Sequence, residues 1–153
     1  MSGTPPIMGG CQCGAVRYSL ARLPTGAHVC HCRMCQRAVG GPFAALTSVP
    51  TGDLAWVRGT PGWFESSNLA RRPFCRDCGT PLGFHYVDSG RINVTIGSLD
   101  DPELAPIAIH YGVESRLSWI RICDDLPQVE TTDDPDSPTR LAELVSHQAG
   151  EGA

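Results

Sequence analysis

The chain has 153 residues, a net charge of −4 and eight cysteines. This length predicts one domain with a hydrophobic core of its own, so the cysteines are not needed as disulfide cross-links. The longest uncharged runs, residues 1–16 and 38–52, are short and broken by glycines and prolines, which excludes a segment that spans a membrane.

Short segments rich in β-branched and aromatic residues, each bounded by turn formers, predict a mainly β fold of short antiparallel sheets. Asp88, Ser89 and Gly90 supply the turn of a predicted hairpin between two of these segments. The predicted strands cover residues 15–21, 43–49, 54–59, 62–67, 82–87, 91–97, 107–113 and 117–122.

Two helical segments are expected. Residues 32–39 predict one short helical turn that ends at Gly40 and Gly41. The tail from Gln128 is rich in Thr, Asp and Pro, and it gains an apolar face only over residues 137–148. There Ser137 can cap a helix, with Leu141, Leu144 and Val145 on one face. The chain therefore divides into a domain over residues 1–127 and an acidic tail over 128–153, with a peripheral helix on a mobile linker.

Four cysteines form two glycine-flanked pairs. The first ten residues lack the charged and apolar regions of a secretory signal, which predicts a cytoplasmic protein whose close cysteines bind metal. Cys11 and Cys13 face the same way if the chain is extended, and Cys75 and Cys78 form a knuckle before Gly79. The four thiolates predict a closed, structural zinc site. The alternative is two separate redox dithiols.

Three further cysteines lie within six positions. Cys30 and Cys32 face the same way if extended, and Cys35 returns to them if the chain turns. Three protein ligands with one open position are typical of a catalytic zinc, so two Zn²⁺ ions per chain are expected. A fourth ligand from a histidine would instead close the site and make it structural. The candidate histidines are His28, His31, His85 and His110.

The charge is divided unevenly along the chain. Residues 124–153 carry a net charge of −7, whereas residues 1–123 carry +3. Seven thiolates around two divalent ions bring the metal-loaded body close to neutral. Since a nucleic-acid partner needs a clustered basic face, none is expected.

The cysteine motifs resemble, in order, those of the family of glutathione-dependent formaldehyde-activating enzymes, which includes centromere protein V. The resemblance covers residues 9–127. It implies a single-domain β-tent fold, a structural zinc on Cys11, Cys13, Cys75 and Cys78, and a catalytic zinc on Cys30, Cys32 and Cys35. It also implies a carbon–sulfur lyase that joins a thiol to formaldehyde as S-hydroxymethylglutathione. The matching motifs are GGCQCGAVRY, CHCRMCQRA, FCRDCGTPLGF and HYGVESRLSW.

The expected partners are a small-molecule thiol, glutathione or another of low molecular weight, and an aldehyde. His110 is the predicted acid or base for the developing alkoxide, with Glu114 and Arg116 close in sequence. Its alternative role is a strand histidine at the sheet surface. Gln36 and Arg37 either support the third ligand or are solvated residues of a helical turn.

Other features suggest a different class of function or none. A non-catalytic zinc module with two structural sites and an acidic tail for a basic partner is the alternative to an enzyme.

Cys123 is predicted to be an idle thiol, because the acidic residues after it raise a thiol's pKa. The sequence does not indicate an oligomeric state. The larger aromatic residues are expected to pack in the core or at sheet edges: Trp56, Trp63, Phe64, Phe74, Phe84 and Trp119.

Overall fold

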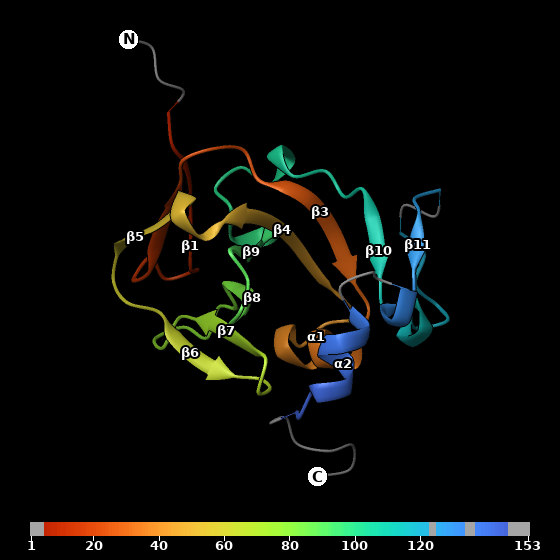
Figure 1. Ribbon diagram of the computed structural model, residues 1–153. Helices are drawn as coiled ribbons and strands as arrows, with labels where there is room; N and C mark the ends of the chain where they lie inside the picture. Colours follow the sequence, from red (N-terminus) through yellow and green to blue (C-terminus); the bar gives the residue numbers. More distant parts are fainter. Residues whose placement is uncertain (1–4, 123–124, 134–136, 147–153) are drawn as a thin grey trace.

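The computed structural model describes residues 5–122, 125–133 and 137–146, so Cys123 lies outside the described residues. Two β-sheets form the main regular structure of the described chain, and two short α-helices lie outside them, which confirms the predicted mainly β fold (Figure 1). The strands are β1 (Ile7–Gly10), β2 (Arg17–Leu20), β3 (Thr25–Cys30), β4 (Ala44–Pro50), β5 (Leu54–Arg58), β6 (Gly62–Glu65), β7 (Ala70–Phe74), β8 (Gly83–Tyr86), β9 (Arg91–Thr95), β10 (Ile109–Tyr111) and β11 (Gln128–Val129).

The smaller sheet has the order β1-β2-β5, and the larger has the order β11-β10-β3-β4-β9-β8-β7-β6. Most ladders are antiparallel, as expected, but β10 pairs in parallel with both β3 and β11. The free edge of β3 explains this difference. β4 occupies one edge of β3 after the chain returns through residues 31–43, so the chain that comes back after β9 adds to the other edge in the same direction as β3.

Seven of the predicted strands are present, and the hairpin between β8 and β9 is confirmed. The strand predicted over residues 117–122 is wrong, because this segment forms a turn in which the Ile120 N–H donates to the Leu117 carbonyl. Trp119 in this segment is 69% exposed, so its side chain lies at the surface and not in the core. The prediction missed β1, β3, β7 and β11. The first three contain glycine, histidine or arginine at positions that alternation alone does not favour, and β11 is only two residues long.

The larger sheet has two faces with different roles. Val49, Ile92 and Val94 project from one face and pack with Tyr18 and Leu20 of the smaller sheet in the main core. Residues of the other parity project from the opposite face, because neighbouring side chains in a strand alternate. The pairing register places these residues on the second face: Cys30, Ala44, Leu46, Thr95, Phe84, Tyr86, Arg72 and Phe64.

Helix α1 (Arg33–Val39) packs against this second face. Its C-cap is Gly40 in the left-handed conformation, as predicted for the end of this helical turn. Cys35 on α1 belongs to a small buried cluster with Ala44 and Leu46 of β4. The second face is therefore covered locally by one short helix rather than by another sheet.

Helix α2 (Ser137–Glu143) lies within the predicted helical segment 137–148, but it ends before Leu144 and Val145, which were expected on its apolar face. Asn68 holds its C-terminal end, since the Asn68 side chain donates to the Glu143 carbonyl and accepts from the Val145 N–H. The Arg140 guanidinium lies 4.4 Å from the centre of the Tyr86 ring. β11 also belongs to the tail and lengthens the larger sheet, so the division at residue 127 stays a prediction.

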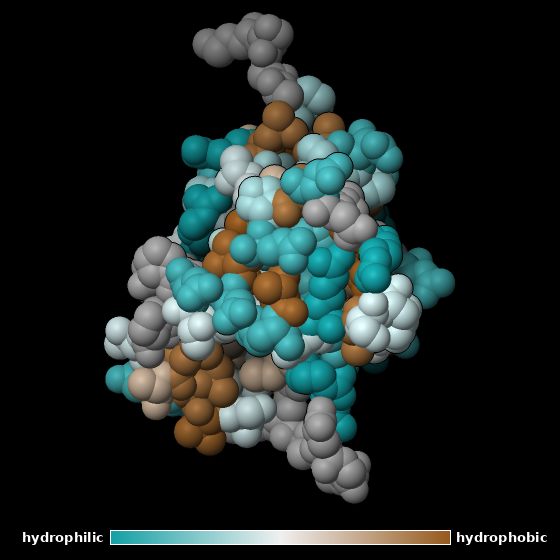
Figure 2. Space-filling model, turned by 90° about the vertical axis from the view of Figure 1, so that its right-hand side faces the viewer, coloured by the Kyte–Doolittle hydropathy of each residue, from teal (hydrophilic) through white to brown (hydrophobic). Residues whose placement is uncertain are grey.

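The surface on the side of β10 and β11 is mostly hydrophilic, with separate hydrophobic patches (Figure 2). None of the helices in the described part of the chain has the length and apolar composition needed to cross a membrane.

Candidate metal centres and the adjoining cavity

The structure brings the sulfurs of Cys11, Cys13, Cys75 and Cys78 within 4.8 Å of one another. Cys11 follows β1, and Cys75 follows β7, so the cluster joins the two sheets. The Sγ atoms of Cys11 and Cys13 are 3.6 Å apart, and those of Cys13 and Cys75 are 3.8 Å apart. A zinc–sulfur bond of about 2.3 Å gives a tetrahedron with edges of about 3.8 Å, so the spacing fits zinc.

Backbone N–H groups support the knuckle as the sequence predicted. Gly79 has a φ of 76°, and its N–H donates to the Cys75 carbonyl. A left-handed φ is favourable for glycine, which has no Cβ. The Val16 N–H donates to the Cys11 sulfur at 3.2 Å. The Val16 hydrogen bond stabilises a thiolate better than a thiol, so this loop is arranged for an ionised Cys11 sulfur.

The four thiols resist complete ionisation without a cation. The backbone of Ala15 lowers the pKa of Cys13, but the neighbouring sulfurs of Cys11 and Cys78 raise it more, to about 12. Hydrogen bonds from the side chain and backbone of Thr80 lower the pKa of Cys78 to about 5. Thiolates held this close together repel one another, and a bound divalent cation stabilises all four of them in the ionised form.

The second cluster consists of Cys30, Cys32 and Cys35, whose sulfurs also lie within 4.8 Å of one another. Cys30 ends β3, Cys32 is the N-cap of α1, and Cys35 lies in the first turn of α1. The Cys30 and Cys32 sulfurs are 3.4 Å apart, and the Cys35 N–H donates to the Cys32 sulfur at 3.3 Å. The three sulfurs therefore form one triangle of a tetrahedral site.

Within the described residues, no histidine, aspartate or glutamate completes this triangle. The rings of two histidines named as possible fourth ligands contact backbone carbonyls, His28 that of Gly26 at 2.8 Å and His85 that of Ser89 at 3.2 Å. The described part of the chain thus supplies three ligands, the number expected at a catalytic zinc.

The other two histidines pair with each other. His31 Nε2 and His110 Nδ1 are joined by a hydrogen bond of 2.8 Å, and both residues are fully buried. Burial and the charges of His110 and Arg116 lower the pKa of His31 to about 4, so its ring is neutral at pH 7. His110 pairs with Val29 across the β3–β10 ladder, so its side chain projects from the face opposite to Cys30. Its role as acid or base stays a prediction.

Gln36 is buried and ties the cysteine loop to the segment after β10. Its side-chain amide donates to the His31 carbonyl at 2.7 Å and to the Ser115 carbonyl at 3.1 Å. These contacts favour the supporting role over that of a solvated residue. Gly112 approaches the same loop so closely that a Cβ atom there would lie 2.9 Å from the Cys32 nitrogen.

Arg72 on β7 is a neighbour of the cluster that sequence reasoning missed. It is 7% exposed, and its Nη2 donates to the Cys35 sulfur at 3.5 Å. Hydrogen bonds from Cys30 and Cys32 hold the pKa of Cys35 well below its usual range, and the Arg72 charge lowers it further. Hydrogen bonds with Cys32 and Cys35 raise the pKa of Cys30 well above its usual range. One thiolate is therefore stabilised by the protein alone.

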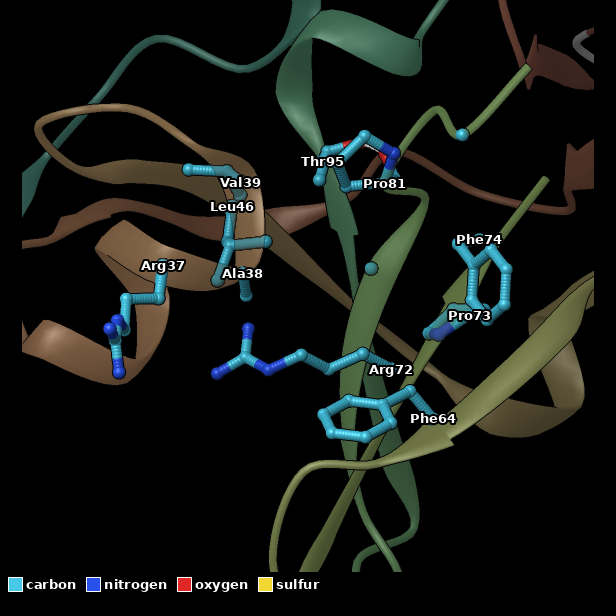
Figure 3. A pocket seen from close by; sticks show the side chains of 12 residues that line it. Arg37, Ala38, Val39, Leu46, Phe64, Arg72, Pro73, Phe74, Pro81 and Thr95 are labelled. Atoms are coloured by element: carbon cyan, nitrogen blue, oxygen red, sulfur yellow. Dashed lines mark hydrogen bonds between the residues drawn. The ribbon is translucent and has the colours of Figure 1, made fainter. Parts of the chain in front are cut away.

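A cavity of about 440 Å³ adjoins the three-cysteine cluster. Figure 3 shows Arg72 reaching from β7 across the cavity toward α1. Val39 and Leu46 line the cavity and also pack against Cys35, so the cavity and the three-cysteine cluster share these two neighbours. The complete lining is Arg37, Ala38, Val39, Leu46, Phe64, Arg72, Pro73, Phe74, Gly79, Pro81, Gly83 and Thr95.

The fold and the two clusters define a mainly β protein of the metal-binding class. Residues 6–114 match the family of glutathione-dependent formaldehyde-activating enzymes, and the chain belongs to this family. An uncharacterized lyase of Schizosaccharomyces pombe is 30% identical over 124 residues, covering 80% of this chain and 82% of the relative. The family is described as one of enzymes, and the relative carries the name of a lyase.

A crystal structure of a Rhodobacter sphaeroides protein shares the fold. Its TM-score is 0.50 at 23% sequence identity, and the match covers 80% of this chain and 100% of that chain. At this identity the likeness concerns the fold alone.

The two clusters should respond differently to loss of a ligand. Cys75→Ser removes a sulfur that joins the two sheets, and a structural zinc contributes about 10–16 kcal/mol, comparable to the ~5–15 kcal/mol stability of a whole domain. We expect little folded Cys75→Ser protein. Cys32→Ser should keep its melting temperature within a few degrees, because a serine oxygen also accepts the N-cap hydrogen bond from Cys35.

Thermal unfolding followed by circular dichroism, with zinc content measured on the same samples, compares the two variants. Equal loss of melting temperature in both variants would show that the three-cysteine cluster also holds the fold together.

Proposed function

We propose that this protein is a zinc-dependent carbon–sulfur lyase that reversibly joins a low-molecular-weight thiol to an aldehyde. Two Zn²⁺ ions per chain are proposed, a structural one on Cys11, Cys13, Cys75 and Cys78 and a catalytic one on Cys30, Cys32 and Cys35. The observation that carries this proposal is the three-sulfur triangle beside a cavity, without a fourth ligand among the described histidines and acidic residues. Family membership supports the reaction type.

The reaction forms a carbon–sulfur bond and an O–H bond, breaks the S–H bond of the thiol and the π bond of the aldehyde, and needs no redox partner. The thiol proton leaves the sulfur, so the net number of protons is unchanged when the oxygen takes one up. The thiol sulfur donates an electron pair to the aldehyde carbon, and the C=O π pair moves to the oxygen, which takes up a proton. The product is an S-hydroxymethyl thioether when the aldehyde is formaldehyde. In the reverse direction the carbon–sulfur bond breaks and the hydroxyl loses its proton.

A zinc held by three thiolates offers one further position for a soft ligand, which favours the ionised form of a bound thiol. The chain's own residues prepare this position. Cys35 is held ionised by its neighbours and by Arg72, and Gln36 fixes the loop that carries Cys30 and Cys32. Gln36 on α1 also donates to the segment after β10, and these contacts limit the movement of the sulfurs.

The proton for the oxygen needs a donor on the face of the sheet that carries Cys30. Tyr86 lies on that face, two residues after Phe84, and the two rings are 4.7 Å apart. Burial raises the pKa of Tyr86, Arg140 lowers it, and all three cysteines of the cluster raise it, so the phenol lies within their electrostatic range. Its hydroxyl donates no hydrogen bond to a described residue. We assign proton donation to Tyr86 Oη, with His110 as the competing candidate.

Glutathione is the first thiol to test, because the family is named for it, and other low-molecular-weight thiols follow. Formaldehyde is the first aldehyde. A cytoplasmic location is proposed, since free thiols and reduced cysteines occur together there.

Exchange spectroscopy by NMR tests the reaction at equilibrium. The thiol and formaldehyde form their adduct without a catalyst, so an enzyme raises only the rate at which the adduct exchanges with the free thiol. We expect the zinc-loaded protein to raise this rate, and Cys32→Ser to bring it back to the uncatalysed value while the variant stays folded. No rate increase with glutathione or with several other thiols would contradict the lyase proposal and favour a zinc-binding interaction module.

A second comparison separates the two candidate proton donors. Tyr86→Phe removes only a hydroxyl, and loss of a general acid typically costs a factor of about 10²–10⁴ in rate. His110→Gln should lower the melting temperature, because it breaks a buried hydrogen bond, but change the rate per folded molecule by less than about threefold. Melting temperature and exchange rate are measured on each variant. A large rate loss in His110→Gln with little change in Tyr86→Phe would assign the proton to His110.

A further inference from the structure

The Arg72 side chain has more hydrogen-bond donors than its described partners use. A guanidinium has five N–H donors. Nη2 donates to the Cys35 sulfur, and the guanidinium lies 4.8 Å from the centre of the Phe84 ring. Nε is buried without a hydrogen-bond partner among the described residues. No hydrogen bond of Nη1 to a described residue is present, although Arg72 lines the cavity.

A buried cation with unused donors is costly unless an anion accompanies it. Arg72 is the only arginine among the buried polar and charged side chains in the described part of the chain. The Cys35 sulfur accepts a hydrogen bond from only one of its nitrogens, Nη2. Arg72 lines the cavity and extends toward α1 (Figure 3), so its Nη1 donors are the ones available to an external anion, whereas Nε is enclosed by protein.

The cavity has the size and lining of a small-molecule site. Its volume of about 440 Å³ falls within the ~300–1,000 Å³ typical of ligand pockets. Phe64, Phe74 and Pro81 give it apolar walls, and the Arg72 side chain crosses it (Figure 3). No acidic residue belongs to the described lining. The cavity therefore favours a small molecule with an apolar body and a negatively charged group.

We propose that this cavity binds the carboxylate of the thiol substrate, and that Arg72 selects for that carboxylate while it contacts Cys35. The inference rests on the proposed function, since it places the acid group of the same thiol whose sulfur goes to the cluster. A guanidinium matches a carboxylate with two parallel N–H donors, which an ammonium group does not. Arg72 thus joins the carboxylate site to the sulfur site through one side chain.

A series of three small thiols of similar size and different charge tests the selection. They are 3-mercaptopropionate, 2-mercaptoethanol and cysteamine, which carry a negative, a neutral and a positive group. We expect the protein to accelerate adduct exchange for 3-mercaptopropionate at least about tenfold more than for the other two, since a charge-assisted hydrogen bond is roughly twice as strong as a neutral one. Arg72→Gln should remove this preference, and Arg72→Lys should keep part of it.

Arg71 provides the matched control. It is the neighbouring arginine, it projects from the opposite face of β7, and its guanidinium lies 4.3 Å from the centre of the Trp63 ring. Arg71→Gln therefore changes the net charge of the chain equally but should leave the preference for 3-mercaptopropionate unchanged. Circular dichroism shows which variants are folded.

A binding measurement without catalysis completes the test. 3-(Methylthio)propionate carries the carboxylate but no free thiol, and we expect it to shift the backbone amide signals of Gly79, Gly83 and Thr95, which line the cavity. Arg72→Lys should weaken these shifts and Arg71→Gln should not.

Equal acceleration of the three thiols would overturn the inference and leave the lyase proposal intact. No acceleration of any thiol, combined with the expected amide shifts, would keep the carboxylate site and reject the lyase. If Arg72→Gln does not fold, the charge series on the unchanged protein and on Arg72→Lys decides the question.

Discussion

The alternation of side chains across the eight-stranded sheet is the constraint on which the site depends. Residues of one parity build the core with the three-stranded sheet, and residues of the other parity build the three-cysteine site. A shift of register by one residue in β8 would exchange Phe84 and Tyr86 for Gly83 and His85. The main core therefore maintains the site indirectly, because burial of Val94 and Ile92 fixes the register that places Thr95 and the cluster on the far face.

The two cysteine clusters differ in how far their ligands lie apart in the chain. The closed cluster unites Cys11 with Cys75, so it ties together segments from both sheets and contributes to the fold. The other cluster uses only the end of β3 and the start of α1, a stretch of six residues. Its geometry is set by the cap at Cys32 and by the hydrogen bond of Gln36. The described residues supply three of the four ligands of a tetrahedral site.

The sequence allowed prediction of what is local. Spacing alone grouped the cysteines, because i and i+2 share a face of an extended chain, and Gly40 marked the end of α1. Arg72, Tyr86 and the cavity could not be predicted, since their placement requires the register of four neighbouring strands. The face of the sheet from which His110 projects also depends on the parallel pairing of β10 with β3, which no local pattern indicates. The buried position of Gln36 was obscured by the charged residues on either side of α1.

The central claim is that the chain holds one closed metal site and one site that accepts an external thiol. Cadmium-113 NMR of the protein loaded with cadmium measures this directly, because the chemical shift of the ion depends on how many sulfur atoms bind it. The account predicts two signals, of which one stays fixed and the other moves toward the four-sulfur value when 3-mercaptopropionate is added. Two signals that both stay fixed on addition of the thiol, or a single signal, would contradict it.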